Sequence, residues 1–271
     1  MKSNKTRIMG VLNITPDSFS DGGKFLDKDK AIAQGLSMAR DGADIIDVGG
    51  ESTRPGAGDL NAEEEISRTV PVIEELSKKL KIPISIDTRK SEVAEAAIKA
   101  GATMINDVSG LRYDPKLAGI AAKYGVAIIL MHMKGTPQNM QDDPKYNNLI
   151  EEIIDGLKGS IRIAKEAGIA EDKIIVDPGI GFGKSTEHNL EIIKSLGELK
   201  TLGRPICIGT SRKSFIGKVL NIPNADDRLA GTLATCIMAV TNGADILRVH
   251  DVRYCKEAAM IVDSILKAGT D

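Results

Sequence analysis

The stretch GADIIDVGGE, residues 42–51, has a glycine, then two small or polar residues, then a short apolar run that ends in polar side chains. The same order recurs in GATMIND, residues 101–107, and in GADILRVH, residues 243–250. A glycine that follows a helical pattern and precedes an apolar run is typical of the turn from a helix into a strand. The three copies therefore predict a helix–turn–strand unit that is used repeatedly.

Short apolar runs that end in polar residues are found all along the chain. Eight of them cover residues 9–13, 45–51, 84–89, 104–107, 127–132, 174–177, 206–211 and 246–250. The segments between them leave room for a helix and two loops, as in folds where strands and helices alternate. Several runs are continuously apolar, which is expected of parallel strands buried on both faces. We therefore predict an α/β fold, an eight-stranded parallel (β/α)8 TIM barrel, with a doubly wound open sheet as the alternative.

The length and charge of the chain limit what it can be. Its 271 residues suit one barrel and contain no Pro-, Ser- or Gly-rich linker, so we predict a single domain over residues 1–271. The 36 Lys and Arg residues nearly balance the 38 Asp and Glu residues, which excludes a strongly basic field for nucleic acid. The first apolar run is too short for a signal peptide or a membrane span. We expect small-molecule partners, with no nucleic acid and no membrane.

The cysteines indicate a cellular compartment. Cys207, Cys236 and Cys255 are odd in number, far apart and without the spacing of a metal site. Buried thiols in a reducing compartment are the simplest interpretation. We therefore predict a cytoplasmic protein.

Three of the four phenylalanines follow predicted strands. Phe19, Phe182 and Phe215 lie in segments rich in Gly or Ser, where core phenylalanines are uncommon. Apolar rings line many ligand pockets, so their placement favours an aromatic ligand. The alternative, that the rings plug the mouth of the barrel, stays open, above all for Phe215.

Segments at the predicted strand ends together resemble one known family. They are MGVLNITPDSFSDGG (9–23), DVGGESTRPGA (47–57), SIDTRK (85–90), INDVSG (105–110), MHMKGTP (131–137), DPGIGFGK (177–184), GTSRKSFIG (209–217) and RVHDV (248–252). In this order they resemble the dihydropteroate synthase family. The resemblance implies a TIM-barrel enzyme of folate synthesis that joins p-aminobenzoate to 6-hydroxymethyl-7,8-dihydropterin pyrophosphate and releases pyrophosphate and 7,8-dihydropteroate. It also implies competition by sulfonamides and a homodimer, for which the helix expected over residues 229–240 is either an interface or an ordinary barrel-facing helix.

The pterin site is expected at the barrel mouth, where the loops after the strands converge. Asp87, Asn106 and Asp177 end three predicted strands, and carboxylate or amide oxygens suit the N–H donors of a pterin edge. The resemblance assigns all three to the pterin, although Asp and Asn also cap helices. It further implies that Lys213 reaches the carbonyl and ring-nitrogen edge. Met131 is expected either on the pterin face or in the core.

The resemblance also implies a subsite for pyrophosphate and Mg²⁺. Arginine suits phosphate because its planar fork donates paired hydrogen bonds. The matched anion contacts are Asn13, Thr53, Arg54, Arg248 and His250. Asn13 is also the expected Mg²⁺ ligand, with Asp17 or Asp21 as further candidates, since Mg²⁺ prefers oxygen and keeps much of its shell from phosphate and water. Residues 15–23 have the composition of a lid over the substrate or of an exposed turn.

The remaining subsite would hold p-aminobenzoate. Its expected contacts are Phe19, Pro55, Phe182, the stem of Lys213, and Ser214 near the carboxylate. We predict a dissociative substitution, in which pyrophosphate leaves before the amine attacks. Asp87, Asp177 and Lys213 are the predicted catalytic residues, and this scheme needs no protein nucleophile.

Other functions remain as alternatives. A pterin-binding methyltransferase that uses methyltetrahydrofolate would share the Asp and Asn contacts but needs no pyrophosphate subsite. A non-catalytic pterin binder would lack Asn13 or the anion contacts, which this chain keeps. We interpret His132 as a hydrogen-bonded structural residue. Residues 179–184 lack the full phosphate-loop pattern, and we expect their glycines to let the backbone bend around the substrate.

Overall fold

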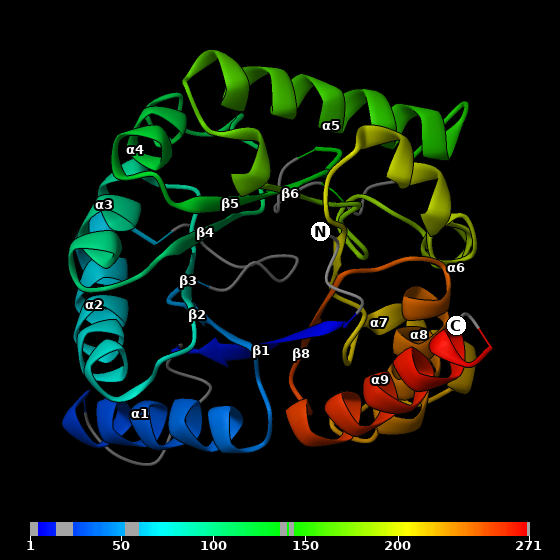
Figure 1. Ribbon diagram of the computed structural model, residues 1–271, viewed down its shortest axis with the longest axis horizontal. Coiled ribbons are helices and arrows are strands. Elements are labelled where there is room, and N and C mark those ends of the chain that lie inside the picture. The colour runs from blue at the N-terminus through cyan, green and yellow to red at the C-terminus, as the bar shows by residue number, and fades with distance from the viewer. Residues whose placement is uncertain (1–4, 15–23, 52–59, 136–139, 141–143, 270–271) are drawn as a thin grey trace.

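In the residues that the computed structural model describes, eight parallel strands lie side by side in the order β6-β5-β4-β3-β2-β1-β8-β7. They are β1 (Arg7–Asn13), β2 (Ile45–Gly49), β3 (Ile84–Asp87), β4 (Met104–Asp107), β5 (Ala127–Met131), β6 (Ile174–Asp177), β7 (Cys207–Ile208) and β8 (Ile246–Val249). A bridge between Val176 and Ile206 joins the two ends of this sheet. The result is a nearly closed barrel (Figure 1). The predicted TIM barrel is confirmed, and the open doubly wound alternative is wrong.

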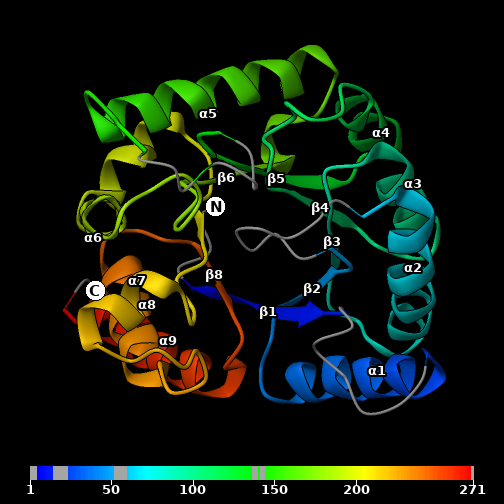
Figure 2. The same cartoon turned by 180° about the vertical axis from the view of Figure 1, so that it is seen from behind.

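The structure describes residues 5–14, 24–51, 60–135, 140 and 144–269, with only the backbone at residues 24–27. Helices surround the strands on the outside, as the view from behind also shows (Figure 2). They are α1 (Lys24–Arg40), α2 (Ala62–Lys79), α3 (Ser91–Lys99), α4 (Lys116–Tyr124), α5 (Leu149–Glu166), η2 (Glu171–Lys173), α6 (Thr186–Lys194), η3 (Leu196–Leu202), α7 (Ser214–Leu220), α8 (Leu229–Thr241) and α9 (Val252–Lys267).

The three glycine-containing repeats form the same turn. Gly42, Gly101 and Gly243 have φ angles of 99°, 115° and 100°, which side chains disfavour. In each case the alanine after the glycine donates its N–H to the carbonyl five residues earlier: Ala43 to Met38 (2.9 Å), Ala102 to Ala97 (3.0 Å) and Ala244 to Ala239 (2.9 Å). This bond ends the helix in a left-handed glycine turn. The predicted helix–turn–strand unit is confirmed at all three places.

The inside of the barrel is built in layers from alternate strands. The even-numbered strands contribute Ile45, Met104, Ile175 and Ile246, which are at most 5% exposed and belong to one buried cluster. We call these four residues the apolar layer. Side chains two residues apart on a strand point to the same side. Two residues further along the same strands stand Asp47, Asn106, Asp177 and Arg248, which we call the polar layer.

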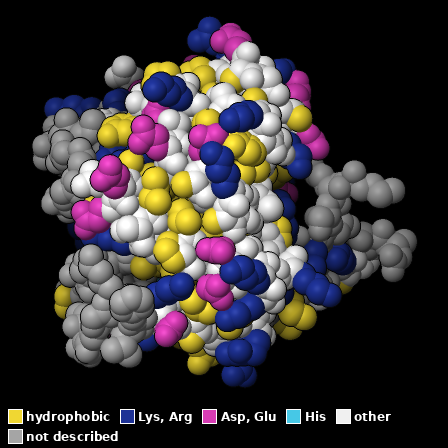
Figure 3. Space-filling model, turned by 90° about the vertical axis from the view of Figure 1, so that its left-hand side faces the viewer, with side chains coloured by type: hydrophobic (Ala, Val, Ile, Leu, Met, Phe, Trp, Pro, Cys, Tyr) yellow, Lys and Arg dark blue, Asp and Glu magenta, His cyan; other side chains and the backbone are white. Residues whose placement is uncertain are grey.

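The surface carries mixed charge. Figure 3 shows one face of the molecule, on which basic and acidic side chains are interspersed among apolar ones. None of the helices in the described ranges is long and apolar enough to cross a bilayer.

Candidate active site

Three members of the polar layer, Asp47, Asn106 and Arg248, are joined by short hydrogen bonds across the barrel. The Oδ2 atom of Asp47 accepts from Arg248 Nε at 2.7 Å and from Asn106 Nδ2 at 3.0 Å. Arg248 Nη2 donates to Asp87 Oδ2 at 2.6 Å. Since these residues come from four different strands, the barrel brings three of the predicted site residues together around Asp47.

The register of the strands places the predicted metal ligand beside the predicted pterin residues. Asn13 lies opposite Gly49, Gly49 opposite Asp87, and Asp87 opposite Asn106. A Cβ atom at Gly49 would lie 3.6 Å from both Asn13 Oδ1 and Asp87 Cβ. Asn13 and Asp87 therefore flank a position that carries no side chain.

The described residues around Asn13 could supply only part of the coordination shell of a hard cation such as Mg²⁺. No cluster of three His, Cys, Asp or Glu side chains that could hold a metal occurs among the described residues. The amide oxygen of Asn13 can serve as one ligand of Mg²⁺ when phosphate oxygens and water supply the other ligands. Asn13 thus fits Mg²⁺ that is bound together with a phosphorylated ligand.

Lys213, in the segment after β7, meets Phe182 of the loop after β6 near Asp177. Asp177 Oδ1 accepts from the N–H of Gly179 at 2.7 Å. Lys213 Nζ donates to the carbonyl of Ile180 and lies 4.3 Å from the centre of the Phe182 ring. A cation at this distance from a ring face is attracted to it. The predicted pterin and p-aminobenzoate residues are therefore contiguous here.

Three other predicted residues lie around this group. Met131 is 5% exposed and belongs to a buried cluster with Phe182 at its edge. Ser214 is exposed and begins α7 directly after Lys213. Phe215 is 2% exposed and belongs to the main core cluster, as in the alternative that its ring is structural.

Burial shifts the ionisation of the central groups. It raises the pKa of the Asp177 carboxyl and that of Asp87, with the Arg248 guanidinium opposing the change at Asp87. Burial also lowers the pKa of Lys213 to about 8, while Asp177 opposes this change. For Arg248, burial lowers the pKa, but Asp47 and Asp87 outweigh burial and raise it. Arg248 is therefore the permanent cation of the polar layer.

His250 is neutral in this setting. Burial, and then the charge of Arg248, lowers the pKa of the imidazole to about 3. Its Nδ1 lies 3.0 Å from Ser211 Oγ, which also accepts the backbone N–H of His250 at 3.2 Å. The Ser211 hydroxyl thus contacts one ring nitrogen of His250, and the other, Nε2, is the ring nitrogen available to a ligand. Among described residues of the predicted pyrophosphate subsite, Arg248 alone carries positive charge, and His250 offers a hydrogen bond.

Lys184 is a buried cation that the sequence analysis missed. It is 2% exposed, and its Nζ donates to the carbonyls of Phe182 at 2.9 Å and His132 at 3.3 Å. It also lies 3.2 Å from His132 Nδ1. Burial lowers the pKa of Lys184 to about 7, with Asp177 opposing. Lys184 ties the loop that carries Phe182 to the end of β5, and His132 is a hydrogen-bonded structural residue, as predicted.

The glycines of residues 179–184 serve this packing. Gly179 and Gly183 have φ angles of 72° and 63°. A Cβ atom at Gly179 would collide with the carbonyl oxygen of His132, and one at Gly183 with that of Lys134. The glycines therefore let this loop lie directly on the segment after β5, a reason that the sequence analysis did not give.

The buried imidazole of His132 makes stability depend on pH. Burial, and then the charge of Lys184, lowers its pKa to about 2, whereas the unfolded chain has an ordinary histidine. The unfolded state therefore takes up the proton first, and stability falls by about 1.4 kcal/mol per pH unit below roughly pH 6.5. We predict that His132→Asn makes the urea-unfolding free energy fall by about 2 kcal/mol less than wild type between pH 6.5 and 5. Groups that do not contact His132 titrate equally in both proteins, so parallel curves for the two would contradict the prediction.

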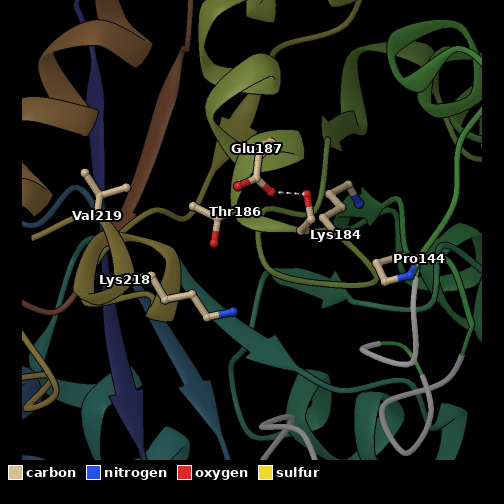
Figure 4. A pocket seen from close by; sticks show the side chains of 7 residues that line it. Pro144, Lys184, Thr186, Glu187, Lys218 and Val219 are labelled. Carbon is tan, nitrogen blue, oxygen red and sulfur yellow. Dashed lines mark hydrogen bonds between the residues drawn. The ribbon is translucent and has the colours of Figure 1, made fainter. Parts of the chain in front are cut away.

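A hollow of about 600 Å³ lies beside this region. It is lined by Pro144, Lys184, Ser185, Thr186, Glu187, Lys218 and Val219. Figure 4 shows these side chains, with the hydrogen bond from Ser185 to Glu187. None of the predicted site residues lines this hollow, so we assign it no part in the reaction.

Several predicted residues lie outside the described residues. They are Asp17, Phe19 and Asp21, with the predicted lid of residues 15–23, and Thr53, Arg54 and Pro55. Glu51 comes directly before residues 52–59 and Leu60 directly after them. The Oε1 atom of Glu51 accepts from the N–H of Leu60 at 2.9 Å. Lys90 Nζ donates to the other carboxylate oxygen of Glu51 at 2.9 Å.

Asp47 is the member of the polar layer that the sequence analysis did not assign. The signal was present in the three repeats, because Asp47, Asn106 and Arg248 each stand five residues after Gly42, Gly101 and Gly243. Two of these three positions were predicted from chemistry, and the shared offset indicates the third.

Comparison with known proteins shows which proteins this chain is similar to. Residues 9–250 match the family model described as "Pterin binding enzyme". The dihydropteroate synthase of Clostridium beijerinckii is 51% identical over 264 residues, which cover 97% of this chain and 95% of that protein. A crystal structure of dihydropteroate synthase from Clostridium difficile in the presence of pteroic acid has a TM-score of 0.91 and 49% identity, covering 96% of this chain and 97% of that one. The Yersinia pestis enzyme with a sulfonamide drug has a TM-score of 0.92 and 42% identity, covering 97% and 95%.

Proposed function

The chain belongs to the dihydropteroate synthase family of pterin-binding enzymes, and we propose that its polar layer is the floor of the site where the reaction occurs. The activity is that of a transferase in folate biosynthesis. It condenses 6-hydroxymethyl-7,8-dihydropterin pyrophosphate with p-aminobenzoate to give 7,8-dihydropteroate and pyrophosphate, and sulfonamides compete with p-aminobenzoate. The relatives do not favour the alternative, a methyltransferase that uses methyltetrahydrofolate.

One observation carries the assignment of the site. Asn106, Asp177 and Arg248 lie in one layer of the barrel, with Asp87 bonded to Arg248 at 2.6 Å. Carboxylate and amide oxygens suit the N–H donors of a pterin edge, and the guanidinium suits the charge of a diphosphate. We therefore assign the pterin to Asp87, Asn106, Asp177 and Lys213, with Met131 beside it.

The other two subsites follow from their neighbours. We assign the pyrophosphate to Asn13, Arg248 and His250, together with Thr53 and Arg54 outside the described residues. The p-aminobenzoate ring is assigned to Phe182, the Lys213 stem and Ser214, together with Phe19 and Pro55. The contact of Lys213 Nζ with the Phe182 ring, at 4.3 Å, supports a shared boundary between the pterin and the p-aminobenzoate.

Mg²⁺ is part of the proposal. Asn13 would hold it through its amide oxygen, and Asp17 or Asp21 would add a ligand. When bound with the diphosphate, the ion would neutralise charge on the leaving group. The protein would contribute a hydrogen bond from the neutral ring of His250 and the cation of Arg248 to the same end.

We propose a dissociative order of bond changes. The bond from the pterin methylene carbon to the diphosphate oxygen breaks first, and its electron pair leaves with pyrophosphate. The resulting methylene cation is favoured by the carboxylates of Asp87 and Asp177, since preorganised charges stabilise charge that develops in a transition state. The amine of p-aminobenzoate then supplies the electron pair of the new C–N bond and loses a proton.

Product formation with and without Mg²⁺ tests the proposal. Wild-type protein is expected to form dihydropteroate only with Mg²⁺, and to release some pyrophosphate when p-aminobenzoate is omitted. Chromatography of the pterins and an assay of pyrophosphate measure the two results. Folded protein that forms no dihydropteroate would overturn the function, whereas pyrophosphate release that always requires p-aminobenzoate would overturn only the dissociative order.

Assembly and location complete the proposal. We propose a homodimer because Ile237 and Met238 on α8 are 39% and 48% exposed, as are Ile261 (64%) and Ile265 (66%) on α9. A homodimer interface at these two helices would cover the exposed apolar side chains, and sedimentation of the purified protein measures the mass. The three free cysteines are buried, which supports a cytoplasmic location that cell fractionation can test.

A further inference from the structure

Asp47 is a wholly buried carboxylate beneath the proposed pterin site. It is 0% exposed, and one of its oxygens, Oδ2, accepts both from Arg248 Nε and from Asn106 Nδ2. Its other oxygen, Oδ1, is buried without a hydrogen-bond partner among the described residues. Burial of a charge costs free energy of desolvation, so the contacts that Asp47 makes indicate what it does at this place.

The first contact decides how Asn106 faces its ligand. An asparagine amide has a donor end and an acceptor end, and either end can face a given partner. A carboxylate only accepts, so Asn106 must turn its Nδ2 toward Asp47 at 3.0 Å. The acceptor oxygen, Oδ1, is then the end left for the ligand, which suits the N–H donors on a pterin edge.

The second contact holds the guanidinium of Arg248. Nε lies 2.7 Å from Asp47, and Nη2 lies 2.6 Å from Asp87. Two carboxylates at different edges of the planar fork restrict its rotation. Asp47 therefore keeps Arg248 at the side of the layer next to Asp87.

We infer that Asp47 is a positioning residue of the synthase, which orients the Asn106 amide toward the pterin and holds Arg248 against Asp87. It acts through these two side chains, because its own carboxylate is covered. The inference rests on the proposed pterin site.

A double-mutant cycle on ligand affinity tests whether Asp47 orients the Asn106 amide. Asp47→Leu removes the acceptor, so the Asn106 amide loses its fixed orientation. We expect its affinity for pteroic acid, measured by titration calorimetry, to fall roughly 10- to 100-fold, the range for one hydrogen bond to a buried or charged group. Asn106→Ala is expected to cost a similar factor, and the double variant no more than the worse single variant.

Two further variants distinguish positioning from a merely structural role. Asp47→Asn keeps an oxygen able to accept both hydrogen bonds, so it should stay within about tenfold of wild type. Asp263→Asn makes the same chemical change at the opposite end of the barrel, where Asp263 accepts from Thr6 at 2.8 Å, and should leave the affinity unchanged. If Asp47→Leu does not fold, Asp47→Ser, whose hydroxyl is too short to reach Asn106, takes its place in the cycle.

The possible failures are distinguishable. Wild-type affinity in the folded Asp47 variant, or losses that add in the double variant, would overturn the inference while leaving the pterin site in place. Wild-type protein that does not bind pteroic acid would instead overturn the proposed site itself.

Discussion

Replacing Asp177 with Asn is expected to lower kcat/KM for dihydropteroate formation by about 100- to 1000-fold without unfolding the protein. The Asp177 carboxylate accepts the N–H of Gly179 at 2.7 Å, and an asparagine oxygen can keep this bond. The amide nitrogen would then face the ligand, where a donor meets N–H donors. A 100- to 1000-fold loss is about 2.7 to 4.1 kcal/mol, which corresponds to one or two hydrogen bonds to a charged group at about 1.5 to 3 kcal/mol each.

Steady-state kinetics of the variant, beside its melting temperature, measure this effect. Asp172→Asn is a matched control, because Asp172 is an exposed carboxylate in η2, just before the other end of β6. The control should keep wild-type kcat/KM. A folded Asp177→Asn protein with nearly normal kcat/KM would remove Asp177 from the pterin site.

Replacing Arg248 with Met is expected to reduce both stability and activity. Arg248 pairs with Asp47 at 2.7 Å and with Asp87 at 2.6 Å, and Asp47 is fully buried. Removal of one partner of a buried ion pair leaves an uncompensated charge and costs about 3 to 5 kcal/mol. We therefore expect a loss of this size in the free energy of unfolding, together with the loss of a cation from the pyrophosphate subsite.

Urea unfolding measures the first part, and the KM for the pterin pyrophosphate measures the second. Arg253→Met is the control, because Arg253 also pairs with a carboxylate, Glu257, at 3.1 Å, but both side chains are exposed. Exposed pairs contribute little, so the control should unfold like wild type. If Arg248→Met is as stable as the control, the buried pairs do not support the barrel in the way we infer.

Much of the fold could be read from local pattern. The repeats that begin at Gly42, Gly101 and Gly243 form the same turn because a left-handed glycine and a bond to the fifth preceding carbonyl are properties of neighbouring residues. The alternation of side chains along a strand then sets which residues point inward. The strand that departs most from its predicted range is the seventh, which spans only Cys207–Ile208, and a turn with a φ of 60° at Arg212 follows it.

Part of the site could also be predicted from local sequence pattern. Asp177 ends its strand, and Asn106 and Arg248 lie one residue before the end of theirs, so residue type, position and the family resemblance together selected them. Asp47 was missed because a carboxylate two residues before the end of β2 has no evident ligand until its partners are known. Lys184 was missed because its contacts, the carbonyls of Phe182 and His132 and the His132 ring, do not form a recognisable sequence motif.

The sequence by itself thus determined the barrel, its turns, its family and the strand-end residues, since these depend on spacing and on residue type. Only the tertiary structure decided the pairing of Asp47 with Arg248, which stand 201 residues apart in the chain. It also decided the neutral state of His250, whose pKa burial and the Arg248 charge lower to about 3. Ionisation and amide orientation depend on groups that meet only when the barrel closes, because desolvation and Coulomb interactions act through space.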